Sequence, residues 1–199
     1  MIKTTAMLLE ELKTYASPKT KLSRMVAQGE LTQVTRGIYE TDRNAAAYLL
    51  AGSIYGPSYI SFDYALAKYG MIPEAVYTIT SATFEKKKKK LYETPFGTFS
   101  YRDVPSSVFP LGQELLREED RWYRIAVPEK ALCDKLFTLP PVANQKELQA
   151  LLLDDLRIDE TGLLALNEGL ISEFSGLYGS TNVTRFAKLL RRWKNESRD

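Results

Sequence analysis

The stretch that most restricts how this chain can fold is residues 17–40, where a helix start, a helix stop and a tight turn follow one another. Ser17 is a favoured residue at the N-cap of a helix, and Pro18 fits the first helical position because N–H groups there have no partner within the helix. Gly29 is a typical residue for ending a helix in the left-handed conformation. The spacing therefore predicts a helix over residues 18–28, with its apolar side formed by Leu22, Met25 and Val26.

A tight hairpin is predicted directly after this helix. Apolar residues precede and follow the dipeptide Arg36-Gly37, and a glycine here suits a short turn between two antiparallel strands. These apolar residues are Leu31, Val34, Ile38 and Tyr39. Further upstream, apolar residues at helical spacing predict a short first helix. They are Met7, Leu8, Leu12 and Tyr15.

Two helices followed by a hairpin form a reduced winged helix-turn-helix, which we expect over residues 1–43. In this architecture the second helix enters the major groove of DNA, and we expect the hairpin to lie along the phosphate backbone. The predicted DNA contacts are Lys19, Thr20, Lys21, Ser23 and Arg24 on the helix, with Gln33, Thr35 and Arg36 on the hairpin. The alternative is that these residues only solvate an exposed helix and hairpin whose role is packing.

The absence of histidine excludes several kinds of catalytic site. With no His and one Cys, the chain lacks the ligands of the common zinc sites and the residues of Ser-His-Asp and Cys-His nucleophile systems. Cys133 falls within a helical pattern, so we expect a small buried residue there. We predict that the chain is not an enzyme and that it uses neither a metal nor a cofactor.

The patterns of hydropathy and charge indicate a soluble protein with more than one binding surface. No apolar run reaches the roughly 20 residues of a membrane-spanning helix, and acidic residues follow the first short apolar stretch, unlike in a secretory signal. We therefore expect a cytoplasmic protein without membrane contact. The net charge is only +2, yet residues 1–43, 80–103 and 180–199 are basic and residues 104–179 are acidic. This division favours one surface for a polyanion and another for a different partner.

The whole chain is predicted to be α+β, with residues 44–199 forming an α/β body that has a β-hairpin and C-terminal helices. A polar stretch after the first hairpin marks the boundary between the two domains. The expected elements are a helix capped by Ser61, a strand over 76–82, a hairpin around the turn 94–97, and a strand followed by a helix from Pro128. Asn144 and Glu147 form a capping-box-like start for a helix over 145–158, and two more helices are expected, the last over 181–196.

A run of five lysines precedes the second hairpin, and its members cannot all point into a core. They are Lys86, Lys87, Lys88, Lys89 and Lys90. The run forms either a solvated sheet edge that discourages aggregation between strands or a strip that binds phosphate. We favour the edge role, with a secondary polyanion contact as the alternative.

Four segments of the chain, in order, resemble the signature stretches of AbiEi-type proteins, the antitoxins of type IV toxin-antitoxin and abortive-infection systems. The segments read GELTQVTRGIYE, SYISFDYALAKYGMIPEAVYTITSAT, TPFGTFSYRDV and RIAVPEKALCDKLF. The similarity runs over most of the chain and is best over residues 22–137.

This resemblance implies an N-terminal winged-helix domain that binds operator repeats in duplex DNA and represses its own operon. It also implies a C-terminal domain that counteracts a partner toxin of the nucleotidyltransferase type. By position, helix residues 19–24 and hairpin residues 33–36 match the DNA-facing elements of the family. The last helices match only loosely, so no residue for toxin neutralisation is carried over.

Two other classes of function remain open. Asp63 with Glu85, Lys86 and Lys87 fits the loose Asp…Glu-x-Lys arrangement of metal-dependent nucleases, in which carboxylates hold magnesium and a lysine positions water. Asp63, however, is expected at the start of a helix rather than on a strand. The other class is a protein-binding module without a DNA role, supported by the amphipathic segment 182–193, whose apolar stripe is flanked by basic residues.

Overall fold

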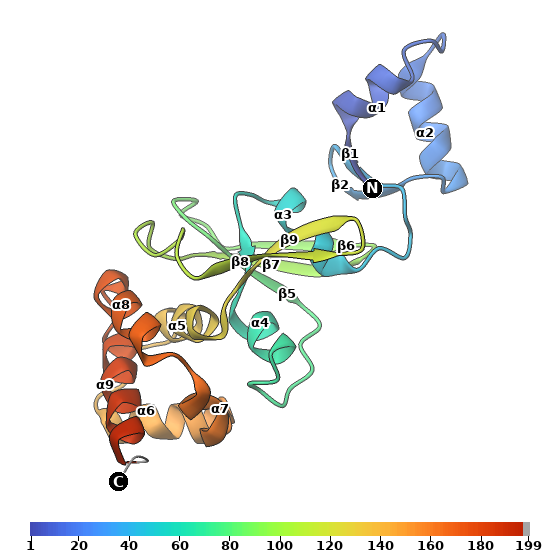
Figure 1. The fold of residues 1–199 in the computed structure, drawn as a ribbon. Helices are drawn as coiled ribbons and strands as arrows, with labels where there is room; N and C mark the ends of the chain where they lie inside the picture. Colours follow the sequence, from blue (N-terminus) through green and yellow to red (C-terminus); the bar gives the residue numbers. More distant parts are fainter. Residues whose placement is uncertain (197–199) are drawn as a thin grey trace.

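The computed structural model describes residues 1–196 and contains a small N-terminal module that projects from a larger body (Figure 1). The module comprises β1 (Ile2–Thr4), α1 (Thr5–Glu11), α2 (Pro18–Gln28), β2 (Thr32–Thr35) and β3 (Ile38–Glu40). The strands of the body are β4 (Tyr59–Ile60), β5 (Ile79–Thr83), β6 (Lys90–Thr94), β7 (Gly97–Asp103), β8 (Gln113–Glu118) and β9 (Arg121–Ala126). Its helices are η1 (Ala47–Leu50), α3 (Ala51–Ile54), α4 (Phe62–Lys68), α5 (Pro128–Thr138), α6 (Gln145–Ala150), η2 (Leu151–Asp155), α7 (Glu160–Ala165), α8 (Glu168–Tyr178) and α9 (Thr181–Glu196). The prediction of an α+β chain is confirmed.

The second helix and the tight turn predicted for the N-terminal module are both present. Helix α2 begins at Pro18, and Gly29 ends it in the left-handed region with φ 70°. Thr35 pairs with Ile38, which leaves Arg36-Gly37 as a two-residue turn between β2 and β3. The Ser17 side chain makes no capping hydrogen bond to the helix backbone. Its hydroxyl lies 2.7 Å from that of Thr20 instead.

The predicted first helix is shorter than expected. It ends at Glu11, so Tyr15 lies outside it, and both Met7 and Tyr15 are exposed. The buried side chains are Leu8 and Leu12, which pack with Leu22 and Leu31 in a small core of the module. The sequence also did not predict β1, which pairs antiparallel with β3 and gives a three-stranded sheet of order β1-β3-β2.

The small sheet of the module has a second packing surface. Val34 is buried in the large core of the body, and Ile2 and Ile38 pack against that same core. Strand residues alternate between the two faces of a sheet, so one face of this sheet covers the helices of the module and the other covers the body. Residues 1–43 therefore form a continuous segment with a small core of their own, and one face of their sheet packs against residues 44–196.

The body is built on a six-stranded mixed sheet of order β6-β7-β5-β4-β9-β8. The hairpins β6–β7 and β8–β9 form its two edges and are antiparallel, whereas β5 pairs parallel with β7 and β4 pairs parallel with β9. The hairpin with its turn at residues 94–97 was predicted correctly. The predicted strand over 76–82 begins three residues later, at Ile79, and β4 and β8 were not predicted.

Helices α4 and α5 cover one side of this sheet and the C-terminal helices cover one end, whereas the short α3 lies on the other side (Figure 1). Helix α4 packs on β5, α5 packs on β9, and the C-terminal helices gather around α5. The Asn144–Glu147 capping box forms, since the Asn144 side chain accepts the Glu147 backbone N–H at 3.0 Å. Helix α6 ends at Ala150 and continues as the short π-helix η2, and three helices follow it within residues 1–196 rather than the predicted two. Helix α9 has the predicted bounds.

Candidate nucleic-acid interface

Helix α2 presents one polar face to solvent and one apolar face to the module. Leu22 is buried, and Met25 and Val26 pack beside it. The opposite side forms an exposed stripe at helical spacing, which we call the α2 stripe. It consists of Lys19, Thr20, Ser23 and Arg24. The structure thus brings four of the five predicted helix contacts onto one exposed face.

Lys21 differs from the other four predicted helix contacts. It is half-buried on the flank of α2, and its ammonium group lies 5.8 Å from the centre of the Tyr15 ring. A cation above an aromatic face gains a modest attraction that is independent of any outside partner. Lys21 therefore has an internal side-chain contact that the two cations of the α2 stripe, Lys19 and Arg24, lack within residues 1–196.

The cations of the α2 stripe have no carboxylate partner. Among the described residues, the side chains of Lys19 and Arg24 form no ion pair and no hydrogen bond. The acidic residues on neighbouring α1 are already paired: Glu10 with Lys13 at 2.5 Å, and Glu11 with Lys3 at 2.6 Å. Helix α2 itself contains no acidic residue. The positive charge of the stripe is therefore available to an external anion.

The β2–β3 turn carries the predicted hairpin contacts, and it lies apart from the α2 stripe. The Thr5 backbone N–H donates to the Gly37 carbonyl at 3.0 Å, so the turn sits beside the start of α1, with α2 across the module from it (Figure 1). Arg36 is exposed, and its side chain has no partner within residues 1–196. Gln33 is exposed and donates to the Thr35 carbonyl at 3.4 Å, while Thr35 is half-buried.

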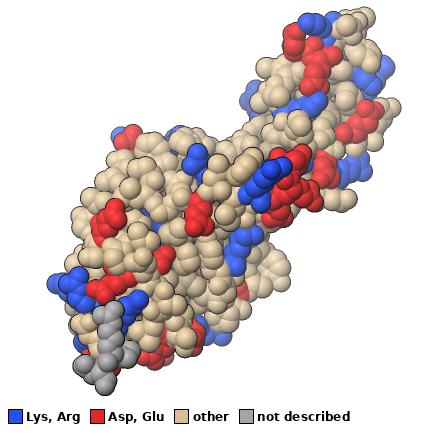
Figure 2. Space-filling model, viewed as in Figure 1, with Lys and Arg blue, Asp and Glu red and all other residues tan. Residues whose placement is uncertain are grey.

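Basic and acidic side chains stand close together on the module in the view of Figure 2. The basic surface in this view is therefore a set of separate cations rather than one continuous patch. An arrangement of this kind suits contacts to individual phosphates, each of which needs one nearby Lys or Arg.

A buried glutamate joins the module to the body. The Glu40 side chain is fully buried and accepts hydrogen bonds from Arg121 of β9 at 2.8 and 3.0 Å, and from the Asp42 backbone N–H at 2.9 Å. The N-terminal ammonium of Met1 also donates to it. Burial by itself would raise the pKa of Glu40, but the hydrogen bonds from Arg121, the N-terminus and Asp42 outweigh it and lower the pKa to about 2. We call this group the Glu40 cluster.

The lysine run lies mostly outside the strand that it precedes. Only Lys90 belongs to β6, which is an edge strand as the sequence suggested. Lys87, Lys88 and Lys89 line a shallow depression of about 300 Å³ together with Arg102. The Lys86 ammonium lies 5.5 Å from the centre of the Tyr55 ring. The run lies at a sheet edge and also borders a depression lined by cations, so the edge role and the phosphate contact both stay predictions.

The C-terminal helix α9 uses most of its charged side chains internally. Its apolar stripe is buried as core, including Phe186, Leu190 and Trp193. Arg185 donates to the carbonyls of Val142 and Ala143, at 2.5 and 2.7 Å. Lys194 donates to the Leu166 carbonyl, and Arg191 pairs with Glu168. These contacts hold the helical end together and leave little free charge for a partner protein.

The nuclease-like arrangement does not assemble as that chemistry requires. Asp63 lies in the first turn of α4, and its carboxylate pairs with the Lys135 ammonium at 2.6 Å. Glu85 is exposed on the loop before β6. Within residues 1–196, no three His, Cys, Asp or Glu side chains come together as ligands for a metal ion.

A buried polar network in the body was not found from the sequence. Lys130 and Asp134, one turn apart on α5, are both fully buried and ion-paired. Lys130 donates to the hydroxyls of Tyr59 and Tyr178 at 2.6 and 2.8 Å, and Asp134 accepts from Ser61 at 2.7 Å. The available signal was the pair of opposite charges at i and i+4 that flanks the apolar run Ala131, Leu132 and Cys133 of α5. The network satisfies both charges and ties β4 and α8 to α5.

Burial changes the protonation behaviour of this network. It lowers the pKa of Lys130, although the neighbouring Asp134 carboxylate acts in the opposite direction. It raises the pKa of Cys133 well above its usual value, so the thiol stays protonated, as expected for a buried structural cysteine.

No protein-family model matches the chain, and no curated protein matches it. Among residues 1–196, no helix combines the length and the apolar character needed to cross a bilayer.

Proposed function

We propose that this protein binds duplex DNA through the α2 stripe and the β2–β3 turn. The observation that carries the proposal is the exposed α2 stripe, whose cations have no carboxylate partner within residues 1–196, while both acids of α1 are paired. Phosphate contacts from such cations supply most of the affinity of a DNA-binding protein, and polar residues between them can reach base edges.

The topology of the module supports the same proposal. The order β1-α1-α2-β2-β3, with the sheet order β1-β3-β2, matches that of a winged helix without its first helix. In a winged helix, the helix before the hairpin is the one that enters the major groove. That position is occupied here by α2, and the β2–β3 turn then takes the place of the wing.

The resemblance to AbiEi-type proteins extends the proposal to biological role. On that basis the protein is an antitoxin and transcriptional autorepressor of a type IV toxin-antitoxin operon in the cytoplasm. Its nucleic-acid partner is the operator duplex, and its body counteracts a nucleotidyltransferase-type toxin, either by direct contact or indirectly. A protein-binding role without DNA receives less support, because α9 engages its charges internally.

A mobility-shift assay tests DNA binding. The full chain is titrated against a duplex from its own promoter and against a scrambled duplex of equal length. Lys19→Ala and Arg24→Ala should each weaken binding by roughly tenfold. Each should also reduce the slope of log K against log salt by about 0.9 for every phosphate that the variant no longer neutralises.

The matched control is Lys146→Ala, which removes one exposed, unpaired charge from α6 in the body. It should leave both the affinity and the salt slope unchanged. If Lys19→Ala and Arg24→Ala keep the affinity of the parent protein, with folding verified by circular dichroism, the assignment of the DNA-binding face is wrong.

The antitoxin role predicts that a neighbouring reading frame encodes a nucleotidyltransferase, and it is tested separately by co-expression with the product of that reading frame. The parent chain should restore growth. The Arg24→Ala variant should do so equally well if neutralisation depends on the body alone. Failure of the parent chain to protect cells from that toxin contradicts the antitoxin role while leaving the DNA-binding result untouched.

A further inference from the structure

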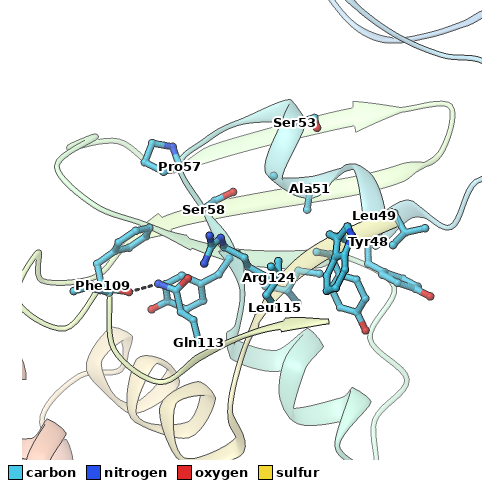
Figure 3. A pocket seen from close by; sticks show the side chains of 16 residues that line it. Tyr48, Leu49, Ala51, Ser53, Pro57, Ser58, Phe109, Gln113, Leu115 and Arg124 are labelled. Carbon is cyan, nitrogen blue, oxygen red and sulfur yellow. Dashed lines mark hydrogen bonds between the residues drawn. The ribbon is translucent and has the colours of Figure 1, made fainter. Parts of the chain in front are cut away.

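A cleft of about 590 Å³ opens on the body between the β8–β9 hairpin and the segment that leads from the module into the sheet (Figure 3). Its volume lies within the range of pockets that hold small molecules. Its walls come from η1 and α3, from the start of β4, and from the loop before β8. Neither the DNA-binding surface nor the buried Lys130 network uses the open face of this cleft.

The pairing of β8 with β9 accounts for the apolar floor of the cleft. Leu115 pairs with Arg124, and Arg117 pairs with Trp122. Since alternate residues of paired strands share a face, Leu115, Trp122 and Arg124 all project to the same side. Leu115 is 50% exposed and Trp122 is 57% exposed. The Trp122 ring and the Leu115 side chain thus stay about half exposed next to Arg124, and the Arg117 guanidinium lies 5.8 Å from the centre of the Trp122 ring.

Arg124 is the one charged residue among those that line the cleft in the described part of the chain. Its guanidinium group forms no ion pair and no side-chain hydrogen bond with any residue from 1 to 196. Figure 3 shows the Arg124 side chain between Ser58 on one side and Gln113 on the other. A guanidinium with no nearby carboxylate is suited to receive an anion from outside, with two parallel N–H donors.

Ser58 provides a second polar group without a partner. The residue is 9% exposed, it lines the cleft, and its hydroxyl oxygen has no hydrogen-bond partner in the structure. Buried hydroxyls are rarely left unsatisfied, because removal from water costs free energy that a hydrogen bond normally offsets. An acceptor placed in the cleft beside Arg124 would satisfy both groups.

We propose that this cleft binds a small molecule with a flat apolar body and one anionic group, of the aryl carboxylate or aryl phosphate class. The anion is held by the Arg124 guanidinium and the Ser58 hydroxyl. The ring lies on the surface formed by Trp122 and Leu115. A polyanion such as nucleic acid fits poorly, because the cleft offers a single cation. This inference does not depend on the proposed DNA-binding function.

Isothermal titration calorimetry on the full chain tests the proposal, with 2-naphthoate and 1-naphthyl phosphate as probes. At least one of them should bind saturably at one site, and the tighter of the two identifies the anion that the cleft prefers. The neutral 2-naphthamide should bind at least tenfold more weakly. If neither anionic probe binds at millimolar concentration, or if the amide binds as tightly as the carboxylate, the proposal is wrong.

Single substitutions test whether the anionic probe binds in the cleft. Arg124→Gln should weaken the anionic probe by about tenfold or more and should leave the amide unaffected, as expected when a charge-assisted hydrogen bond is removed. Ser58→Ala should weaken it by a few-fold. The control Lys146→Gln removes an exposed charge of α6 that has no ion pair among residues 1–196 and lies outside the cleft, and it should have no effect. Equal effects of Arg124→Gln and Lys146→Gln, or unchanged affinity in a folded Arg124→Gln protein, overturn the assignment.

Discussion

Replacing Glu40 by glutamine should destabilise the protein in a pH-dependent way. The folded protein holds the pKa of Glu40 at about 2, against an ordinary value of 4.5. Each pKa unit corresponds to about 1.36 kcal/mol, so the full shift is worth about 3 kcal/mol at neutral pH. Arg121 and the Met1 ammonium reach solvent, and screening there reduces the expected contribution to about 1–2 kcal/mol.

The direction of the pH dependence follows from the lowered pKa. A carboxylate with a depressed folded pKa stabilises the protein fully above its unfolded value and loses that contribution as the pH falls toward its folded value. The contribution of Glu40 should therefore be complete above about pH 5.5 and fall to less than half of that value at about pH 3. Glu40→Gln removes this titration, so the stability difference between the two proteins should shrink over the same interval.

Urea denaturation at pH 7 and at pH 3 measures this difference. Glu30→Gln is the matched control, because Glu30 is an exposed glutamate of the same module without an ion pair in the described chain, and it should change stability by less than about 0.5 kcal/mol. The reasoning is refuted if Glu40→Gln is as stable as the parent at pH 7, or if its deficit is the same at both pH values. Arg121→Gln combined with Glu40→Gln should cost less than the sum of the two single changes.

Three further predictions concern the lysine run, the buried network and the end of α2. Replacing Lys87, Lys88 and Lys89 by glutamine should lower the salt slope of DNA binding by about 0.9 per phosphate contact if the depression binds phosphate. If the run only protects the sheet edge, light scattering should detect aggregation with an unchanged slope. Lys130→Met should cost roughly 3–5 kcal/mol in urea denaturation, since it leaves the Asp134 charge buried and unpaired, and adding Asp134→Leu should recover part of the loss. Gly29→Ala should lower the melting temperature, because φ is 70° there and a Cβ atom would overlap the Arg43 guanidinium that donates to the Gly29 carbonyl at 2.8 Å; an unchanged melting temperature would contradict this.

Part of the candidate site was accessible from the sequence because it depends on helical periodicity. The bounds of α2 and the repeat of 3.6 residues per turn place Lys19, Thr20, Ser23 and Arg24 on one face, opposite Leu22. The sequence did not show that Lys21 would lie on the flank beside Tyr15, nor that the β2–β3 turn would sit beside α1. Those positions depend on how the two helices pack on the small sheet.

The sequence by itself determined the elements whose signals are local. Helix α2, the two-residue turn at Arg36-Gly37, the α5 start at Pro128 and the capping box at Asn144 all follow from backbone preferences and hydrogen bonds between near neighbours. Only the tertiary structure decided how β1 and β4 pair, because both strands are short and take their partners from distant parts of the chain. It also brought Glu40 to Arg121, and it placed Arg124 and Ser58 in one cleft, where neither side chain has a hydrogen-bond partner among residues 1–196. Such contacts depend on the path of the whole backbone, which no local pattern specifies.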